Sequence, residues 1–133
     1  MLKIIVNGSF DIVHMGHLKL LEQARSYPES FVYVLIDSDR RISELKGHTR
    51  PINSVLERKY LLEQLKTVDK VDIFDSDSEL INLIKSYKPD IMLKGSDYKN
   101  KKIIGSEYCK HIEFFDRINE YSTTQKIHYI TNR

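Results

Sequence analysis

Two spacings of hydrophobic residues alternate along this chain. Short and nearly continuous apolar runs occupy residues 2–6 and 31–36, a pattern typical of parallel strands that are buried on both faces. Between these runs, Leu18, Leu21 and Ala24 recur at the spacing of an amphipathic helix. The chain therefore begins with a strand, a helix and a second strand. Similar apolar runs predict further strands at residues 71–74, 90–93 and 112–115.

Helix start signals predict three more helices. Ser54, with Glu57 three residues later, forms a capping box. Asp77 or Ser78 is expected to cap a second helix, and Ser122 to begin the last one. We expect these helices to bury Leu56, Tyr60, Leu61 and Leu65 in the first, Leu80, Leu83 and Ile84 in the second, and Ile127 and Ile130 in the third.

This order of strands and helices predicts an α/β fold. Strands separated by helices of such length form right-handed βαβ units, so the sheet is expected to be parallel and covered by helices on both faces. A chain of 133 residues is long enough for a single core. We therefore expect one domain, residues 1–133.

Composition excludes several classes of function. The net charge is +2 without any basic block, which argues against nucleic-acid binding. No apolar run approaches the ~18 residues that a membrane-spanning helix needs, and the N-terminus enters a strand without a signal-peptide pattern. The single cysteine, Cys109, is compatible with the cytosol and is expected to be a packed thiol in a helix. We expect a cytoplasmic protein that contacts neither membrane nor nucleic acid.

The stretch from Gly8 to His17, Gly-Ser-Phe-Asp-Ile-Val-His-Met-Gly-His, carries the strongest functional signal. It follows the first strand directly, and loops at the carboxyl ends of strands are where open α/β sheets bind ligands. His14 and His17 share one face of the helix that they open. A helix N-terminus offers unpaired N–H groups and partial positive charge, and Gly16 leaves the backbone bare. These features predict a phosphate-binding site.

Two other interpretations of the histidine pair stay open. Both side chains could be surface residues in the first turn of a helix. They could also be metal ligands, with Asp11 adding a carboxylate. However, no second cluster of histidine or cysteine accompanies them, so we expect no metal site built from protein ligands. The alternating acids Asp72, Asp75, Asp77 and Glu79 lack the glycine and distal glutamate of a calcium loop.

Residues 8–17 resemble the G-x-F-D-x-x-H-x-G-H signature of the cytidylyltransferase-like nucleotidyltransferase superfamily. Further segments resemble the adenylyltransferase domain of ADP-heptose synthase. The agreement extends over nearly the whole chain in the order of the family. These segments are Leu45-Lys46-Gly47, Thr49-Arg50-Pro51-Ile52-Asn53 with Glu57-Arg58, Leu93-Lys94-Gly95-Ser96-Asp97-Tyr98, Ile104-Gly105-Ser106-Glu107 and Ser122-Thr123-Thr124.

The resemblance implies a Rossmann-like three-layer α/β/α domain with a five-stranded parallel sheet. It implies nucleotidyl transfer, in which a substrate phosphate attacks the α-phosphate of a nucleoside triphosphate and releases pyrophosphate. Two anions must meet in that reaction, so positioning and electrostatic stabilisation dominate catalysis. Mg²⁺ is expected to accompany the triphosphate, held mostly by phosphate oxygens and water. Related enzymes are commonly dimers, so a homodimer is expected.

The resemblance also assigns roles to residues. His14, His17 and Lys46 are expected to be catalytic, with Lys46 in a flexible loop after the second strand. Asp11 could instead orient a histidine or cap its own loop, and Arg58 could pair with an acid on its own helix. Expected at the nucleotide are Gly8, Ser9, Phe10, Asp11, Gly16, Lys94, Gly95, Asp97, Ser122, Thr123 and Thr124, and at the substrate phosphate Arg50, Arg58 and Arg117.

Three alternative functions are compatible with the sequence. Lys94–Tyr98 and the T-R-P-I-N run favour an enzyme that transfers a nucleotidyl group from ATP to a sugar phosphate and so forms a nucleotide sugar. Arg117, five residues before Ser122, instead matches an arginine of glycerol-3-phosphate cytidylyltransferase, which uses CTP and a small phosphorylated alcohol. A nucleotide-binding module without catalysis is the third alternative, although a sensor would not need the two histidines and Lys46.

Overall fold

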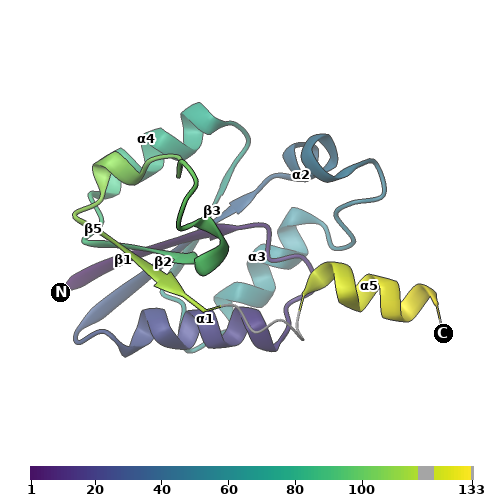
Figure 1. Cartoon of the computed structure of the whole chain (residues 1–133), viewed down its shortest axis with the longest axis horizontal. Coiled ribbons are helices and arrows are strands. Elements are labelled where there is room, and N and C mark those ends of the chain that lie inside the picture. The colour runs from purple at the N-terminus through teal and green to yellow at the C-terminus, as the bar shows by residue number, and fades with distance from the viewer. Residues whose placement is uncertain (117–121, 133) are drawn as a thin grey trace.

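A five-stranded parallel sheet forms the centre of the molecule (Figure 1). The computed structural model describes residues 1–116 and 122–132. The strands run in the order β3-β2-β1-β4-β5, and every neighbouring pair is parallel. The predicted three-layer α/β fold is therefore confirmed. The strands are β1 (Leu2–Gly8), β2 (Ser30–Asp37), β3 (Lys70–Phe74), β4 (Ile91–Gly95) and β5 (His111–Phe115).

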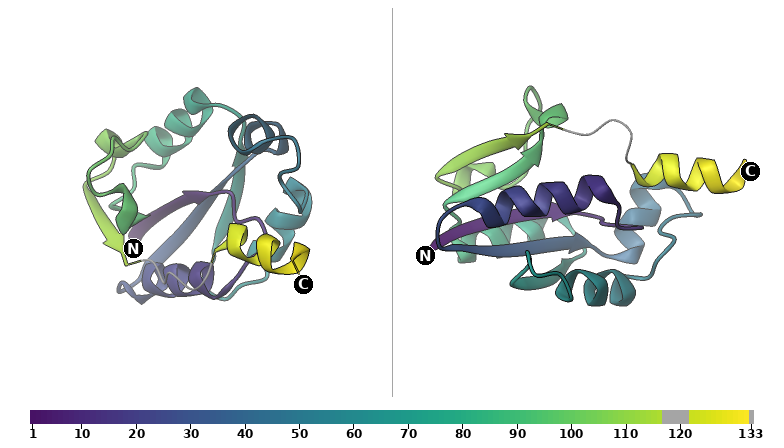
Figure 2. Two further views of the ribbon diagram at one scale, coloured as in Figure 1. Left: turned by 45° about the vertical axis from the view of Figure 1, so that its right-hand side comes forward. Right: turned by 90° about the horizontal axis from the view of Figure 1, so that it is seen from below.

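Helices cover both faces of this sheet. In Figures 1 and 2, α1 and α4 lie on opposite sides of the strands, and α5 extends beyond their carboxyl ends. The helices are α1 (Met15–Ser26), α2 (Asp39–Lys46), α3 (Val55–Glu63), α4 (Asp77–Tyr87) and α5 (Thr123–Thr131), with 3-10 turns η1 (Ser96–Tyr98) and η2 (Ser106–Tyr108).

Side chains of β1 alternate between two core layers. Ile4 and Val6 pack with Leu21 of α1 and with α3, whereas Ile5 faces the opposite layer with Leu80 of α4. This alternation follows from the two-residue period of a strand. The chain leaves β1 towards β2 on one side and returns through β4 on the other, so the strand order reverses between β1 and β4. Ligands of open α/β sheets bind at such a reversal.

Helix α3 buries a different face from the one that hydrophobicity predicts. Leu56, Tyr60 and Leu61 are exposed, and only Leu65 of the expected face packs against the core. The fully buried residues of α3 are instead Arg58 and Leu62. The burial of Arg58 explains the difference. Its guanidinium donates to acceptors inside the protein, so this side of α3 can face the core although it carries a charge.

Other predictions about elements also need correction. Lys46 ends helix α2 rather than lying in a loop; Ser38 caps this helix by accepting from the Arg41 backbone N–H, and Gly47 follows it with φ 104°. Ser76, not Asp77 or Ser78, caps α4. Helix α5 has no buried residue among those described, and Ile130 is exposed, contrary to its predicted inner position. The half-buried Cys109 directly follows the η2 turn instead of lying in a helix.

Candidate active site

The loop between β1 and α1 is held in an uncommon backbone conformation. Phe10 and Ile12 have φ values of 51° and 53°, a left-handed region that β-branched residues rarely adopt. Asp11 lies between them with no exposed surface, and its carboxylate accepts the backbone N–H groups of Ile52 (2.7 Å) and Asn53 (2.9 Å). Such strain persists where the surroundings fix it, and it concentrates at functional sites.

The side chains of His14 and His17 accept backbone N–H groups at the start of α1. Nδ1 of His14 accepts the Gly16 N–H at 3.1 Å, and Nδ1 of His17 accepts the His14 N–H at 3.2 Å, which together form a capping box. The two rings stack with centroids 3.9 Å apart. Because each Nδ1 accepts a hydrogen bond, Nε2 is the protonated nitrogen in each neutral ring.

A cavity of about 280 Å³ opens beside these rings at the carboxyl ends of β1 and β4. Thirteen of the residues predicted from the sequence line it together. Asn7, Leu20, Tyr98 and Phe115 also line it, and sequence reasoning did not single them out as site residues. The thirteen are Gly8, Ser9, Phe10, His14, Gly16, His17, Lys46, Arg50, Gly95, Asp97, Ser122, Thr123 and Thr124.

Two cations, Lys46 and Arg50, line this cavity together with the histidines. Lys46 Nζ donates to Ser9 Oγ at 3.2 Å, and Arg50 Nε lies 3.7 Å from the buried carboxylate of Asp11. Burial lowers the pKa of Lys46, and the neighbouring charge of Arg50 lowers it further. A bound polyphosphate would relieve both effects, because it supplies negative charge where two cations are held together.

The N-terminus of α5 closes another side of the cavity. Ser122 Oγ accepts the Gln125 N–H at 3.0 Å and caps the helix, as predicted. The hydroxyl of Thr123 donates to the backbone carbonyl of Asp11, 112 positions earlier in the chain. This bond fastens the helix N-terminus to the loop that carries the histidines. The N–H groups at the start of α5 thus add a second positive helix end to the cavity.

Gly95 and Asp97 lie close together in the lining of the cavity. A Cβ atom at Gly95 would lie 2.6 Å from Asp97 Oδ1, so the carboxylate occupies the space that a side chain would need. Among the described residues that line the cavity, Asp97 is the one acidic residue. One carboxylate beside a polyphosphate site suits Mg²⁺, which prefers phosphate oxygens, water and one or two carboxylates. Asp97 could hold such an ion, which would neutralise charge on the phosphates.

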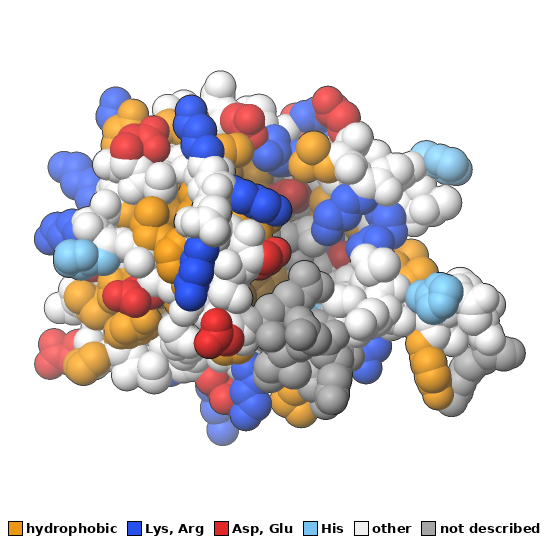
Figure 3. All heavy atoms as spheres, in the orientation of Figure 1, with side chains coloured by type: hydrophobic (Ala, Val, Ile, Leu, Met, Phe, Trp, Pro, Cys, Tyr) orange, Lys and Arg blue, Asp and Glu red, His pale blue; other side chains and the backbone are white. Residues whose placement is uncertain are grey.

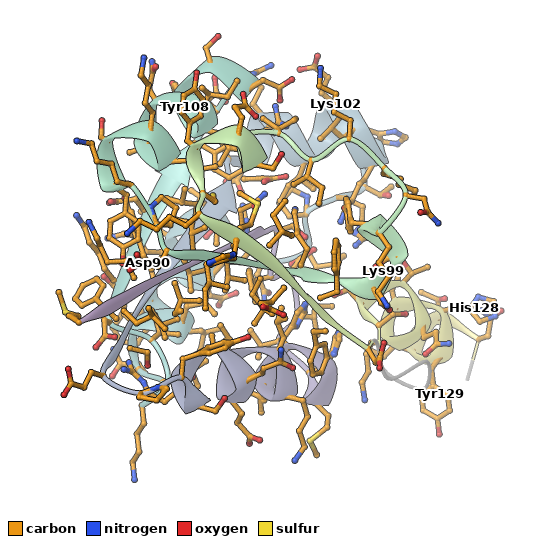
Figure 4. The ribbon with its side chains drawn as sticks, turned by 60° about the vertical axis from the view of Figure 1, so that its left-hand side comes forward. Asp90, Lys99, Lys102, Tyr108, His128 and Tyr129 are labelled. Atoms are coloured by element: carbon orange, nitrogen blue, oxygen red, sulfur yellow. The ribbon has the colours of Figure 1, made fainter. Side chains whose placement is uncertain are left out.

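A second cavity, of about 260 Å³, adjoins the first on the α4 face of the sheet. Both cavities share Asn7, Gly8, Ser9, Lys46 and Tyr98. Lys and Arg side chains border the hollow visible in Figure 3, and Figure 4 shows Lys99 and Lys102 on the segment between β4 and β5. The remaining lining residues are Asp37, Arg41, Leu45, Phe74, Leu80, Lys94, Lys102, Ile103 and Ile104.

Burial changes the pKa of both charged groups at the strand ends in this second cavity. It raises the pKa of Asp37, an effect that the charges of Arg41, Lys46, Arg58 and Lys94 oppose. It lowers the pKa of Lys94, against the charges of Asp37 and Asp97. Burial thus disfavours the charged form of each group, and the opposite charge of the other group partly restores it. Such shifted pKa values are common at functional sites.

Three predicted site residues do not line the first cavity, and a fourth, Arg117, is not among the described residues. Asp11 caps the segment at Ile52 and Asn53 instead of facing the nucleotide cavity, because the backbone N–H groups occupy its carboxylate. Lys94 lines the second cavity rather than the first.

Arg58 is the third, and its prediction as a substrate-phosphate ligand is wrong. Its side chain has no exposed surface and donates to the backbone carbonyls of Asn53 (3.0 Å), Ser9 (2.9 Å) and Asp37 (2.8 Å). It also forms an ion pair with Asp39 at 2.8 Å, on α2 rather than on its own helix. Arg58 therefore holds the loops of the site together from behind.

Residues 1–116 and 122–132 contain neither a metal-binding cluster nor a membrane-spanning helix. No group of three or more His, Cys, Asp or Glu residues is arranged to hold a metal ion there. The alternating acids Asp75 and Asp77 form ion pairs with Arg40 and Arg41 instead. None of the helices in this part of the chain has the length and apolar character that crossing a bilayer requires.

Nearly the whole chain is similar to proteins of one known family. Residues 5–128 match the family described as cytidylyltransferase-like. The chain is 44% identical over 127 residues to the bifunctional protein HldE of Campylobacter fetus, and 45% identical over 121 residues to HldE of Campylobacter concisus. These matches cover 96% and 91% of this chain but 27% and 25% of those proteins.

A solved structure shares the fold. The crystal structure of the lipopolysaccharide core biosynthesis protein from Thermoplasma volcanium superposes with a TM-score of 0.68 at 23% identity. The match covers 87% of this chain and 98% of the other. The likeness supports the three-layer architecture.

Proposed function

The chain belongs to the cytidylyltransferase-like family, and we propose that it transfers an adenylyl group from ATP to the phosphate of a sugar phosphate. The products would be a nucleotide sugar and pyrophosphate. One observation carries this proposal: two helix N-termini, Lys46 and Arg50 line one cavity, and a second polar cavity shares five of its lining residues. Such a pair of cavities can hold a triphosphate and a phosphorylated acceptor side by side.

The proposed reaction needs no nucleophile from the protein. An oxygen of the acceptor phosphate forms a bond to the α-phosphorus, and the bond from that phosphorus to the bridging oxygen of pyrophosphate breaks. The Nε2–H donors of His14 and His17 would stabilise charge on the triphosphate as it moves to the leaving group. Lys46 lines both cavities, so it would reduce the repulsion between the two anions.

Support for ATP and a sugar phosphate comes from sequence. The segments around Arg50 and Lys94 resemble the adenylyltransferase domain of ADP-heptose synthase, and the HldE relatives agree with that resemblance. We propose that Mg²⁺ enters with ATP, beside Asp97. We also propose that the protein acts in the cytoplasm, with which its single cysteine is compatible, and that it is a homodimer, as the resemblance implies.

Release of pyrophosphate tests the proposal directly. Purified protein with Mg²⁺ would be assayed against ATP, CTP, GTP and UTP, each paired with mannose 1-phosphate, glucose 1-phosphate or glycerol 3-phosphate. We expect pyrophosphate with ATP and a sugar phosphate, and none without an acceptor. Activity confined to CTP and glycerol 3-phosphate would replace the proposed substrates. Nucleotide binding without pyrophosphate from any pair would indicate a module without catalysis.

A further inference from the structure

Three polar side chains stand in a row where β2, β1 and β4 end. The register pairs Asn7 with Leu35, two residues before Asp37, and pairs Ile5 with Met92, two residues before Lys94. Side chains two positions apart lie on the same face of a strand, and Ile5, Leu35 and Met92 all belong to the core layer under α4. Asp37, Asn7 and Lys94 therefore continue that layer into the second cavity, which all three line.

Asn7 occupies the middle of this row with an unsatisfied side chain. Its Oδ1 atom is buried and has no hydrogen-bond partner among the described residues. A buried carbonyl oxygen without a donor is destabilising, and folded proteins contain few of them. Asn7 also lines both cavities, so it forms part of the wall between the proposed nucleotide and acceptor positions. A missing hydrogen bond at such a place points to a ligand that supplies it.

The neighbours of Asn7 indicate the chemistry of that ligand. Asp37 offers a carboxylate, with Arg41 Nε 3.9 Å from its Oδ2, and Lys94 Nζ lies 4.5 Å from the centre of the Tyr98 ring. Phe74, Leu80 and Ile103 form an apolar part of the cavity lining. A carboxylate, an amide and an ammonium above apolar side chains suit a molecule with several hydroxyl groups and C–H faces.

We propose that Asn7 is a specificity-determining residue that binds a hydroxyl group of the acceptor's sugar, between Asp37 and Lys94. This inference rests on the proposed sugar-phosphate substrate and adds where the sugar lies. The acceptor phosphate would then lie towards Lys46, which lines both cavities. An asparagine amide both donates and accepts hydrogen bonds, and its terminal torsion is broad. The amide can therefore turn its buried oxygen towards a bound hydroxyl.

The side-chain amide of Asn7 provides a readout that does not require turnover. In ¹⁵N-labelled protein its NH₂ signals are assigned by their loss in Asn7→Ala, and the exposed Asn82 on α4 serves as an internal control. We expect mannose 1-phosphate to shift the Asn7 signals in a saturable way. Inorganic phosphate should leave them in place, and the Asn82 signals should not move with either.

Kinetics then separate the role of Asn7 from a structural one. We expect Asn7→Ala to raise KM for the sugar phosphate about tenfold, the scale of one lost hydrogen bond, with KM for ATP unchanged. The same exchange at Asn82 should change neither constant. Unshifted Asn7 signals and an unchanged acceptor KM, in protein that releases pyrophosphate, would overturn the inference and leave the proposed function intact. Shifted Asn7 signals without pyrophosphate from any substrate pair would uphold the sugar site and reject the proposed reaction.

Discussion

His14 and His17 each combine two tasks in one ring. Nδ1 of each ring caps the first turn of α1, and the capping bond places the proton of a neutral ring on Nε2. The first turn is thereby fixed with two donors on one helix face. Removing either ring would therefore affect both helix stability and the binding of charge, unless the replacement preserves the cap.

Asparagine at position 14 separates these two tasks. Asn is a good N-cap residue, so His14→Asn should keep the cap while losing the imidazole Nε2–H. We expect kcat to fall by about 10²–10³, as for one lost charge-stabilising donor, with the melting temperature nearly unchanged. Pyrophosphate release and calorimetry measure the two effects. An active variant with a lowered melting temperature would assign His14 to structure alone.

The lowered pKa of Lys46 predicts how activity depends on pH. In the proposed reaction protonated Lys46 binds phosphate, and its pKa in the free protein lies below the usual 10.5. The value of kcat/KM for ATP should therefore decline as the pH rises through that lowered pKa. Arginine stays charged over this range, so Lys46→Arg should move the decline to higher pH. Lys66→Arg, at an exposed position, is the matched control; equal profiles for both variants would contradict the assignment.

Site residues were predictable from sequence where they share one local motif. The loop, the histidines and Ser122 line one cavity, and their capping bonds involve neighbours within three positions. The partners of Asp11 and Arg58 were not predictable, since these side chains bind backbone groups 41 and 49 positions away. Asn7 looked like an ordinary strand end, and its importance depends on the register with β2 and β4.

At the scale of elements, α3 shows how a buried charge changes which helix face is inside. Hydrophobicity alone selects Leu56, Tyr60 and Leu61 as the inner residues, whereas the structure buries Arg58 and Leu62. Arginine is rarely placed in a core, because burial requires acceptors that the sequence does not reveal. Helix α2 was not predicted, although Ser38 before it and Gly47 after it mark its two ends.

This rotation of α3 predicts opposite effects for two leucines on one helix. Leu62 has no exposed surface, so Leu62→Ala should lower the free energy of unfolding by about 2–5 kcal/mol. Leu56 is 73% exposed, and Leu56→Ala should change that free energy by less than about 0.5 kcal/mol. Urea unfolding measures both values. If Leu56→Ala lowered the free energy of unfolding more than Leu62→Ala, the face of α3 predicted from hydrophobicity would be the buried one.

For the whole molecule, the sheet topology explains why the site forms at one edge. Parallel strands bring the ends of β1, β2 and β4 together, and the reversal between β1 and β4 leaves room for a ligand there. Segments distant in sequence then complete the site, with Thr123 of α5 bound to the loop at Asp11. The pattern of strands and helices predicted the sheet. It could not predict two adjoining cavities, which depend on how loops fold over the strand ends.

The most direct test is whether a triphosphate binds beside the paired imidazoles. Long-range ¹H–¹⁵N spectra of the five histidines would be recorded while the protein is titrated with Mg²⁺ and a non-hydrolysable ATP analogue. We expect saturable shifts at Nε2 of His14 and His17, and none at His48 or His111. Saturable nucleotide binding that leaves the His14 and His17 signals unmoved would contradict the proposed site.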